Sequence, residues 1–262
     1  MDLRCDGLDS PVWRVWLVPD AEGVVAIGGP GIAALEQLLL RAQDDTNCRA
    51  LVIASDGGEF CRGMDLGALT HGDPAARHEA IAGFARCLGL LRWLRVPSLC
   101  IVDGAALGGG VGLAAACDLV LASRAASFAL PELLLGLIPA VVLPVLRERL
   151  GMSRARWLTL TGETLSAAVA QQLGLVDELC DDPTLALAAR LKRVLRSSPA
   201  AIARLRTFSA EIADMPLAEA LAAGVARTTA DTSDPEVVSA VLGYAAGVAP
   251  PWFARYRPGG HE

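Results

Sequence analysis

The stretch GAALGGGVGLAAACD, residues 104–118, contains three consecutive glycines followed by an apolar, helix-forming run. It continues from SLCIVDG, residues 98–104, a short apolar segment that predicts a buried strand. A glycine run between a strand and a helix lets other groups approach the main chain closely. It also places N–H groups without acceptors at the helix N-terminus, where the helix dipole favours negative charge. The stretch therefore predicts either close helix–strand packing or a site that binds an anionic group through main-chain N–H groups.

Outward from this stretch, short apolar runs alternate with helical segments. Strands are expected at residues 12–18, 50–54, 98–104 and 119–122, with shorter candidates at 24–27 and 128–130, and helices at residues 32–42, 74–94 and 109–116. This order predicts an α/β fold whose sheet contains parallel strands.

The C-terminal part of the chain is mainly helical in pattern. Helix N-caps are expected at Ser166, at Ser198 and around residues 232–235. We expect a core domain over residues 1–198 and a helical region with an irregular tail over residues 199–262.

Composition narrows the classes of protein. The 262 residues are 53% hydrophobic and carry a net charge of −6, which argues against nucleic acid as a partner. The seven cysteines are scattered without CxxC spacing, so neither a zinc site nor a disulfide framework is predicted. The N-terminal sequence does not resemble a signal peptide, and no long apolar run predicts a membrane span. We therefore expect a cytoplasmic protein with no metal, no membrane association and no nucleic-acid partner.

A second glycine-containing loop, FCRGMDL at residues 60–66, follows the strand expected at 50–54. Like the glycine run, it leads from a buried strand towards a helix. Two main-chain N–H groups that converge from these loops would form an oxyanion hole for a thioester carbonyl that becomes an enolate. The glycine spacing fits neither the dinucleotide fingerprint GxGxxG nor the phosphate loop GxxxxGK[ST], so a phosphate cradle is not predicted.

Four ordered motifs resemble the enoyl-CoA hydratase/isomerase, or crotonase, superfamily. They are FCRGMDL at 60–66, GAALGGGVGLAAACDLVLAS at 104–123, FALPELLLGLIP at 128–139 and LTGETLSAAVAQQLGLVDEL at 160–179. The resemblance extends over about residues 12 to 200. It implies an α/β crotonase-like spiral of ββα units, a C-terminal helical trimerisation region, and an acyl thioester substrate held by its pantetheine arm.

The resemblance also implies roles for individual residues. It places the two oxyanion-hole donors at the main-chain N–H groups of Met64 and Gly109. Hydratases of the family use two catalytic glutamates, of which one corresponds to Glu132 in the PE motif and the other to Gly112. Gly112 cannot position or activate a water molecule, so simple hydratase chemistry is not expected. Gly112 itself remains a candidate for substrate contact.

One carboxylate can still move a proton. Glu132 can remove an α-proton from a thioester and return it either to carbon, which isomerises a double bond, or to a β-hydroxyl, which gives a syn dehydration. The apolar surroundings of Glu132 are expected to raise its pKa towards a useful value.

Four residues near the first loop are weaker candidates for substrate binding. Arg62 is a candidate for contact with the pantetheine phosphate or with an acidic group of a carrier protein, and an exposed surface arginine is the alternative. Asp65 is expected to cap the following helix, with substrate contact as the alternative. His71 and His78 follow the loop in a region that often borders the acyl pocket in this family, and a solvated histidine is the alternative for each.

The segment PAVVLP, residues 139–144, indicates a branch of the superfamily. Common hydratases and isomerases have a glycine-rich PGxGGT-like segment here. Together with GMDL and GGVGL, PAVVLP resembles the dehydratases of polyketide β-branching cassettes, which dehydrate a 3-hydroxy-3-methylglutaryl group on an acyl carrier protein. The decarboxylases of the same cassettes use a lysine and a histidine near the acyl pocket. The single lysine, Lys192, lies far beyond the site motifs and does not favour that reaction.

We therefore expect a 3-hydroxy-3-methylglutaryl dehydratase that assembles as a homotrimer or hexamer and uses no metal or redox cofactor. Its substrate would be carried on the phosphopantetheine of an acyl carrier protein, or on coenzyme A. Two alternatives stay open. The first is a Δ3,Δ2-enoyl-CoA isomerase or an enoyl-CoA hydratase-like enzyme. The second is a non-catalytic assembly subunit with the same fold.

Overall fold

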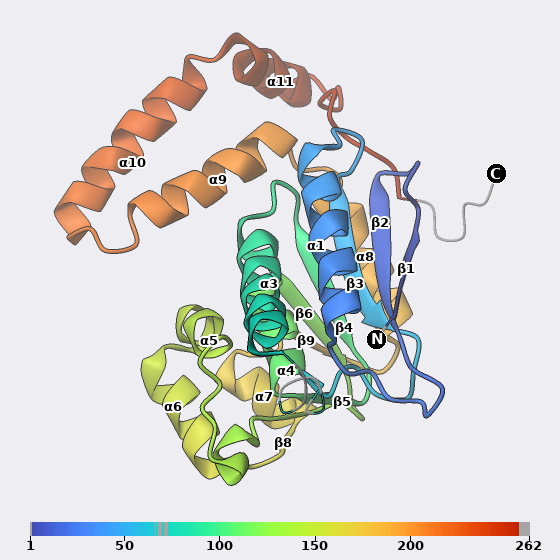
Figure 1. Cartoon of the computed structure of the whole chain (residues 1–262). Helices are drawn as coiled ribbons and strands as arrows, with labels where there is room; N and C mark the ends of the chain where they lie inside the picture. Colours follow the sequence, from blue (N-terminus) through green and yellow to red (C-terminus); the bar gives the residue numbers. More distant parts are fainter. Residues whose placement is uncertain (1, 66, 68–69, 71–72, 257–262) are drawn as a thin grey trace. The chain divides into compact units, whose positions relative to one another are not determined.

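The computed structural model describes residues 2–65, 67, 70 and 73–256 (Figure 1). The chain divides into two compact units, residues 1–190 and 191–262. The first unit contains a six-stranded sheet and a three-stranded sheet, and the second contains helices. In the part of the chain that the structure describes, no helix is both long enough and apolar enough to cross a bilayer.

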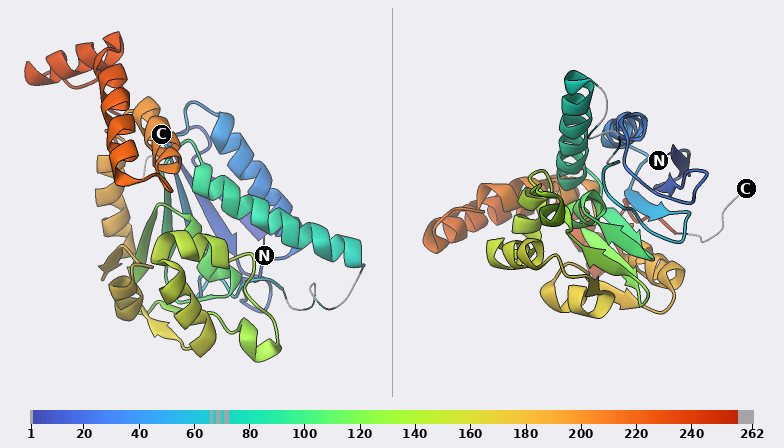
Figure 2. Two further views of the ribbon diagram at one scale, coloured as in Figure 1. Left: turned by 90° about the vertical axis from the view of Figure 1, so that its left-hand side faces the viewer. Right: turned by 60° about the horizontal axis from the view of Figure 1, so that its bottom comes forward.

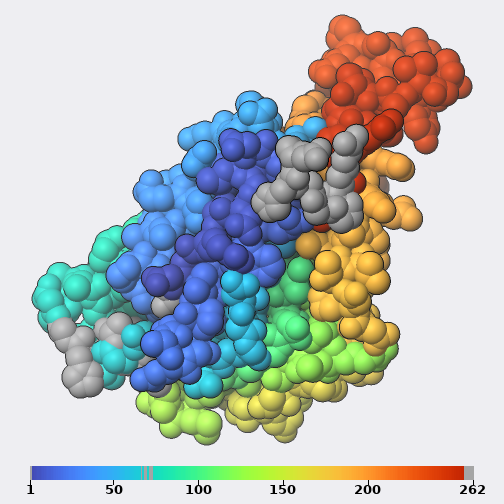
Figure 3. Space-filling view, turned by 90° about the vertical axis from the view of Figure 1, so that its right-hand side faces the viewer, coloured from blue at the N-terminus to red at the C-terminus, as the bar shows by residue number. Residues whose placement is uncertain are grey.

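The six-stranded sheet has the order β1-β2-β3-β4-β6-β9. Its strands are β1 (Asp2–Asp6), β2 (Val12–Val18), β3 (Ala50–Ser55), β4 (Ser98–Val102), β6 (Leu119–Ser123) and β9 (Glu178–Cys180). β1 pairs antiparallel with β2, and every other neighbouring pair is parallel. The predicted α/β class and parallel pairing are confirmed. β1 was not predicted because its polar sequence DLRCD forms an exposed edge, which Figure 3 shows in dark blue on the surface of the first unit.

Two long helices cover one face of this sheet. Figures 1 and 2 show α1 (Gly29–Asp44) and α3 (Pro74–Trp93) side by side. Each has a proline in its first turn, where a missing N–H leaves no intrahelical bond unmade. α1 buries Leu35 and Leu39 and α3 buries Phe84, so the helices complete the core above the sheet.

The quoted glycine stretch begins in the smaller sheet. That sheet has the order β5-β7-β8, with β5 (Ala105–Leu107), β7 (Ser127–Ala129) and β8 (Leu165–Ser166). The strand expected at 98–104 ends at Val102 in β4, and the chain turns into β5 before the buried helix α4 (Gly109–Ala116). The unit β4-β5-α4 is a ββα unit of the predicted spiral. The short candidate at 24–27 forms only a single parallel bridge, between Ile27 and Met64.

The remaining elements of the first unit are helical. They are the 3-10 helix η1 (Glu132–Leu135) and the helices α5 (Leu143–Leu150), α6 (Met152–Thr161), α7 (Ala167–Leu173) and α8 (Pro183–Val194), which continues past residue 190. Ser166 caps α7 as predicted, since its hydroxyl accepts the Val169 N–H at 3.4 Å.

The second unit is built from α9 (Pro199–Glu211), α10 (Leu217–Thr232) and α11 (Pro235–Ala245). Ser198 caps α9 as predicted. Of the residues around 232–235, Asp234 is the N-cap of α11, whereas Thr232 ends α10. The apolar side chains Leu205, Leu217, Leu221, Val225, Val241 and Leu242 are all exposed.

Close contact between α4 and the loop at 60–65 holds the two glycine-containing segments together. A Cβ atom at Gly110 would lie 2.2 Å from the carbonyl oxygen of Cys61, which is closer than any real contact. Cys61 also forms a parallel bridge with Ala106. The glycine at position 110 therefore permits close packing of α4 against this loop.

Because of this contact, we expect a single added methyl group at Gly110 to destabilise the fold strongly. We expect Gly110→Ala to lower the free energy of unfolding by about 3 kcal/mol, the upper end of the range for overpacking, because the main chain of Cys61 must shift. The matched control is Gly89→Ala in α3, where a Cβ meets nothing within 4 Å, and this change should raise the stability by about 0.5–1 kcal/mol. Urea unfolding curves measure both values. Equal stability of Gly110→Ala and the wild type would contradict the packing.

Candidate active site

Met64 presents its main-chain N–H away from the rest of its loop. In the parallel bridge between Ile27 and Met64, the bonds are Ile27 N–H to Gly63 O, at 2.7 Å, and Asp65 N–H to Ile27 O, at 2.9 Å. The bridge therefore uses the carbonyl of Gly63 and the N–H of Asp65, which flank Met64. The N–H of Met64 itself points away from Ile27. Met64 is also one of the residues that line a cavity.

Gly109 supplies a second N–H at the start of α4. Its N-cap, Gly108, has φ +50°, and Gly63 has φ +86°, so both positions favour glycine. A Cβ atom at Gly63 would lie 2.8 Å from the nitrogen of Gly109, which places the two loops in direct main-chain contact. Among the described residues, no acceptor is recorded for the N–H of Met64 or of Gly109. Met64 and Gly109, the two residues predicted to supply the donors, therefore line one cavity, and neither N–H has a recorded acceptor in the part of the chain that the structure describes.

Glu132 faces the same region from η1. A Cβ atom at Gly108 would lie 2.9 Å from Oε1 of Glu132, so the carboxylate rests against the N-cap of α4. Its other oxygen, Oε2, is buried and has no hydrogen-bond partner among the described residues. Burial raises the pKa of Glu132. A hydrogen bond from the main-chain N–H of Glu132 to its own carboxylate lowers the pKa and offsets part of this effect. The expected direction of the pKa shift is thus present in the structure.

A cavity of about 590 Å³ joins these groups, a volume typical of small-molecule sites. Apart from glycine main chain, its lining is mostly apolar and comes from α3 and from the segment 131–142. The lining residues are Val24, Ala26, Arg62, Gly63, Met64, Asp65, Gly67, Ile81, Phe84, Leu107, Gly108, Gly109, Pro131, Glu132, Leu135, Leu137, Ile138, Pro139, Ala140, Val141 and Val142. Among these described lining residues, only Arg62, Asp65 and Glu132 carry charge.

The other predicted residues lie in different places. Arg62 lines the cavity, and its exposed side chain donates a 2.6 Å hydrogen bond from Nε to Glu59. Asp65 also lines the cavity, and its Oδ1 accepts the Gly67 N–H at 2.7 Å. His78 is exposed on α3 and is not a lining residue. His71 lies outside the described residues.

Gly112 lies behind the cavity wall and does not line it. A Cβ atom at this position would lie 2.8 Å from Cγ2 of Val142, and Val142 does line the cavity. The structure therefore fills with Val142 the space into which a second carboxylate would have to reach. The sequence motifs do not predict this contact, although Val142 belongs to the segment PAVVLP that differs from common hydratases.

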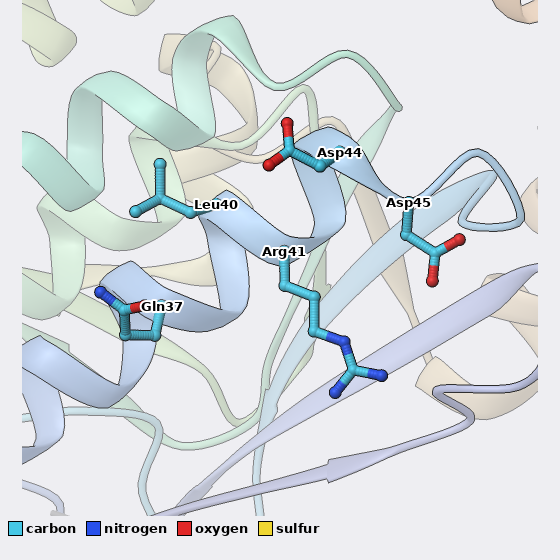
Figure 4. Close-up of a pocket in the computed structure, with 5 residues that line it drawn as sticks. All are labelled: Gln37, Leu40, Arg41, Asp44 and Asp45. Carbon is cyan, nitrogen blue, oxygen red and sulfur yellow. The ribbon is translucent and has the colours of Figure 1, made fainter.

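A second hollow, of about 530 Å³, lies on the outer side of α1. Figure 4 shows its five lining residues, Gln37, Leu40, Arg41, Asp44 and Asp45. The guanidinium carbon of Arg41 lies 5.3 Å from the ring centroid of the buried Trp13. This cation–π contact orders a surface arginine. None of the residues predicted for the active site lines this hollow.

Comparisons with known proteins agree with this geometry. The family model described as enoyl-CoA hydratase/isomerase matches residues 26–253. The chain is 34% identical to the enoyl-CoA isomerase/hydratase fer4 of Mycosarcoma maydis over 183 residues, which cover 68% of this chain and 67% of that protein. It is 32% identical to a carnitinyl-CoA dehydratase of Salmonella heidelberg over 218 residues, which cover 80% of this chain and 81% of that protein.

A solved structure gives the same result for the fold. An enoyl-CoA hydratase from Shewanella pealeana superposes with a TM-score of 0.88 at 26% identity, covering 96% of each chain. The chain therefore belongs to the enoyl-CoA hydratase/isomerase family, and the predicted crotonase fold is confirmed. The prediction of an enzyme of the hydratase and dehydratase class is confirmed as well.

The buried carboxyl predicts a pH-dependent stability. Because the pKa of Glu132 is raised in the folded state, ionising this group costs stability. The cost is absent below the ordinary glutamate pKa of about 4.3 and grows as the pH rises through the raised folded value. We expect Glu132→Gln to melt with the wild type near pH 4 and at a higher temperature at pH 8.

Thermal melts across this pH range measure the difference. The exposed Glu163, changed to Gln, is the matched control and should show no such gain at high pH. A Glu132→Gln variant that is less stable than the wild type at pH 8 would contradict the burial of an ionisable carboxyl.

Proposed function

We propose that this protein dehydrates a 3-hydroxy-3-methylglutaryl thioester carried on an acyl carrier protein. The observation that carries the proposal is the buried, unpartnered Oε2 of Glu132, which shares a cavity with two main-chain N–H groups. A carboxylate in this setting has no structural hydrogen bond to maintain through Oε2 among the described residues. That oxygen remains available to accept a proton from a bound thioester.

The reaction follows from these three groups. The N–H groups of Met64 and Gly109 donate hydrogen bonds to the thioester oxygen, and Glu132 removes the α-proton. The electrons of the Cα–H bond move into the enolate, whose oxygen charge the two donors stabilise. Each such donor contributes about 10²- to 10³-fold in rate in known enzymes. The enolate then collapses and the β-hydroxyl leaves with the proton from Glu132, which gives water, an enoyl thioester and the original carboxylate.

The assignment to a carrier-bound substrate rests on the resemblance of the segment PAVVLP and on the entrance of the cavity. Arg62 is the one cation among the described lining residues, and its side chain is exposed. This position supports contact with the phosphate of a pantetheine arm or with an acidic carrier protein. The proposed chemistry uses the protein and the thioester alone, and needs no metal or redox cofactor. We place the reaction in the cytoplasm.

A Δ3,Δ2-enoyl thioester isomerase is the second candidate. Its reaction needs the same single carboxylate and the same pair of donors, with the proton returned to carbon. The apolar lining of the cavity and the name of the relative fer4, an enoyl-CoA isomerase/hydratase, favour it. The two reactions differ in mass balance, because dehydration releases one water and isomerisation releases nothing.

The first experiment follows the mass of the substrate. The wild type is expected to convert a 3-hydroxy-3-methylglutaryl carrier protein to a product lighter by one water. Glu132→Gln should lose at least about 10²-fold in kcat, since a positioned general base contributes 10²–10⁴-fold. Glu163→Gln, an exposed change in the same unit, should retain wild-type turnover.

Other results of this assay have defined meanings. Unchanged substrate mass together with activity on a 3-enoyl thioester would favour the isomerase. Equal turnover of the same thioester on coenzyme A would reject the carrier protein as a required partner. Absence of turnover on all of these substrates would favour the non-catalytic assembly subunit.

We also propose that the protein assembles as a trimer or a hexamer. The exposed apolar side chains of the second unit support this, with Leu221 at 62% and Val225 at 69% exposure on α10. Sedimentation equilibrium should give three or six times the mass of one chain. The double change Leu221→Glu and Val225→Glu should lower this mass, whereas a monomeric wild type at micromolar concentration would contradict the assembly.

A further inference from the structure

We propose that Glu59 is a positioning residue, which holds Arg62 in the lining of the cavity as the recognition group for the phosphate of a pantetheine arm. This inference rests on the proposed function, of which it uses only the thioester carried on pantetheine. It commits Arg62 to the phosphate rather than to the acidic side chains of a carrier protein. It also gives a role to Glu59, which is not one of the described lining residues.

The carboxylate of Glu59 joins two segments that line the cavity. Its Oε1 accepts the main-chain N–H of Val25 at 3.1 Å, and the two neighbours of Val25 in the chain, Val24 and Ala26, are lining residues. Its Oε2 accepts the Nε–H of Arg62 at 2.6 Å. Only 12% of the Glu59 side chain is exposed. Both carboxylate oxygens are therefore held, and the group has little freedom to move.

Arg62 is held at its main chain and again near the end of its side chain. Its main-chain N–H donates to the carbonyl oxygen of Val25 at 2.8 Å, and its Nε is bound by Glu59. The side chain is nevertheless 55% exposed. Within the described part of the chain, no acceptor is recorded for either terminal nitrogen of the guanidinium. These two nitrogens form a planar fork that matches two oxygens of one phosphate group.

Holding the arginine in advance matters more for binding than for stability. An ion pair with an exposed partner contributes little to the stability of a fold. A free arginine, in contrast, loses the freedom of several rotatable bonds when it is immobilised on a ligand, and this loss weakens binding. Glu59 removes most of that freedom before the ligand arrives, so the fork of Arg62 can bind an anion at a smaller entropic cost.

The position of Arg62 favours the phosphate over the acidic side chains of a partner protein. A thioester on pantetheine enters the cavity by its arm, and the phosphate is the anionic group of that arm. A cation fixed in the cavity lining can meet this group in every substrate molecule, whichever protein carries it. The acidic side chains of a carrier protein, in contrast, stay on the surface of the carrier.

A binding experiment tests the phosphate contact without any turnover. Acetyl-phosphopantetheine and acetyl-pantetheine differ only in the phosphate, and neither has a β-hydroxyl to lose. Isothermal titration calorimetry should show that the wild type binds the phosphorylated thioester at least about tenfold more tightly, as expected for hydrogen bonds to a charged group. Arg62→Gln should abolish this phosphate preference.

Glu59→Gln separates positioning from simple charge. The amide oxygen of glutamine can still accept the N–H of Val25, but its NH₂ group cannot accept the Nε–H of Arg62. Loss of a negative charge beside Arg62 would by itself strengthen phosphate binding. Loss of positioning should instead lower the phosphate preference at least about threefold. The matched control is Glu178→Gln, which removes an equal 2.6 Å contact to Nε of Arg190 away from the described cavity lining and should change nothing.

Thermal melts establish that each variant is folded. If Glu59→Gln does not fold, Arg62→Lys replaces it. Lysine keeps the positive charge but has neither an Nε that Glu59 can hold nor a planar fork, so the phosphate preference should again fall at least about threefold. A full preference in Arg62→Lys would mean that charge alone is sufficient and would overturn the positioning.

Three further results would overturn the proposal. They are a wild type without phosphate preference, a preference that survives Arg62→Gln, and a preference that is unchanged or increased in Glu59→Gln. If the wild type lacks the preference but Arg62→Gln weakens binding of a whole carrier protein, the acidic groups of the carrier are the ligand instead.

The outcome is independent of the proposed dehydration. A protein that shows these preferences but leaves the 3-hydroxy-3-methylglutaryl thioester unchanged would lose the dehydratase assignment and keep the phosphate site. A protein that dehydrates this thioester without any phosphate preference would keep the assignment, and only the roles of Glu59 and Arg62 would fail.

Discussion

The site depends on one main-chain contact between two loops that are over forty residues apart in the sequence. Gly63 approaches the nitrogen of Gly109 so closely that a Cβ atom would lie at 2.8 Å, and Gly110 approaches the carbonyl of Cys61 in the same way. These approaches fix the start of α4 against the loop at 60–65. Both N–H donors belong to this contact, so their relative position is set by main chain alone. Hydrogen-bond donors held in this way need no reorganisation when charge develops on a substrate oxygen.

The carboxyl of Glu132 lies against the start of the same helix, α4. Oε1 of Glu132 rests against Gly108, where the absent Cβ makes room for it, and Oε2 is buried without a hydrogen bond among the described residues. Burial of an unpartnered polar oxygen costs free energy. Such a cost is common at active sites, where stability is given up for a group that must bind a substrate. The first unit offsets it with a core in which α4 is completely buried.

The sequence predicts the local elements of the fold better than the contacts between distant segments. β2 and α4 have the bounds that their apolar patterns predict, because each signal lies within one continuous segment. The strand expected at 98–104 is in fact β4 followed by β5, since periodicity does not record the turn at Gly104, where φ is +82°. The roles expected of Met64, Gly109 and Glu132 came from family motifs. The contact between Val142 and Gly112 could not be predicted in this way. No local sequence pattern indicates which side chain packs against a glycine thirty residues earlier in the chain.

The support of Glu132 is unusual for a residue that must be held accurately, because η1 buries none of its own residues. Its leucines Leu133, Leu134 and Leu135 are all exposed, so the core does not anchor it. The carbonyl of Glu132 instead accepts the N–H of Leu137 at 3.0 Å, and Gly136, at φ +73°, closes the turn. Main-chain hydrogen bonds therefore fix the backbone from which the side chain of Glu132 extends. The side chains of the same segment remain available to line the cavity, as Leu135, Leu137 and Ile138 do, so one short stretch of chain supplies both the carboxyl of Glu132 and part of the apolar lining.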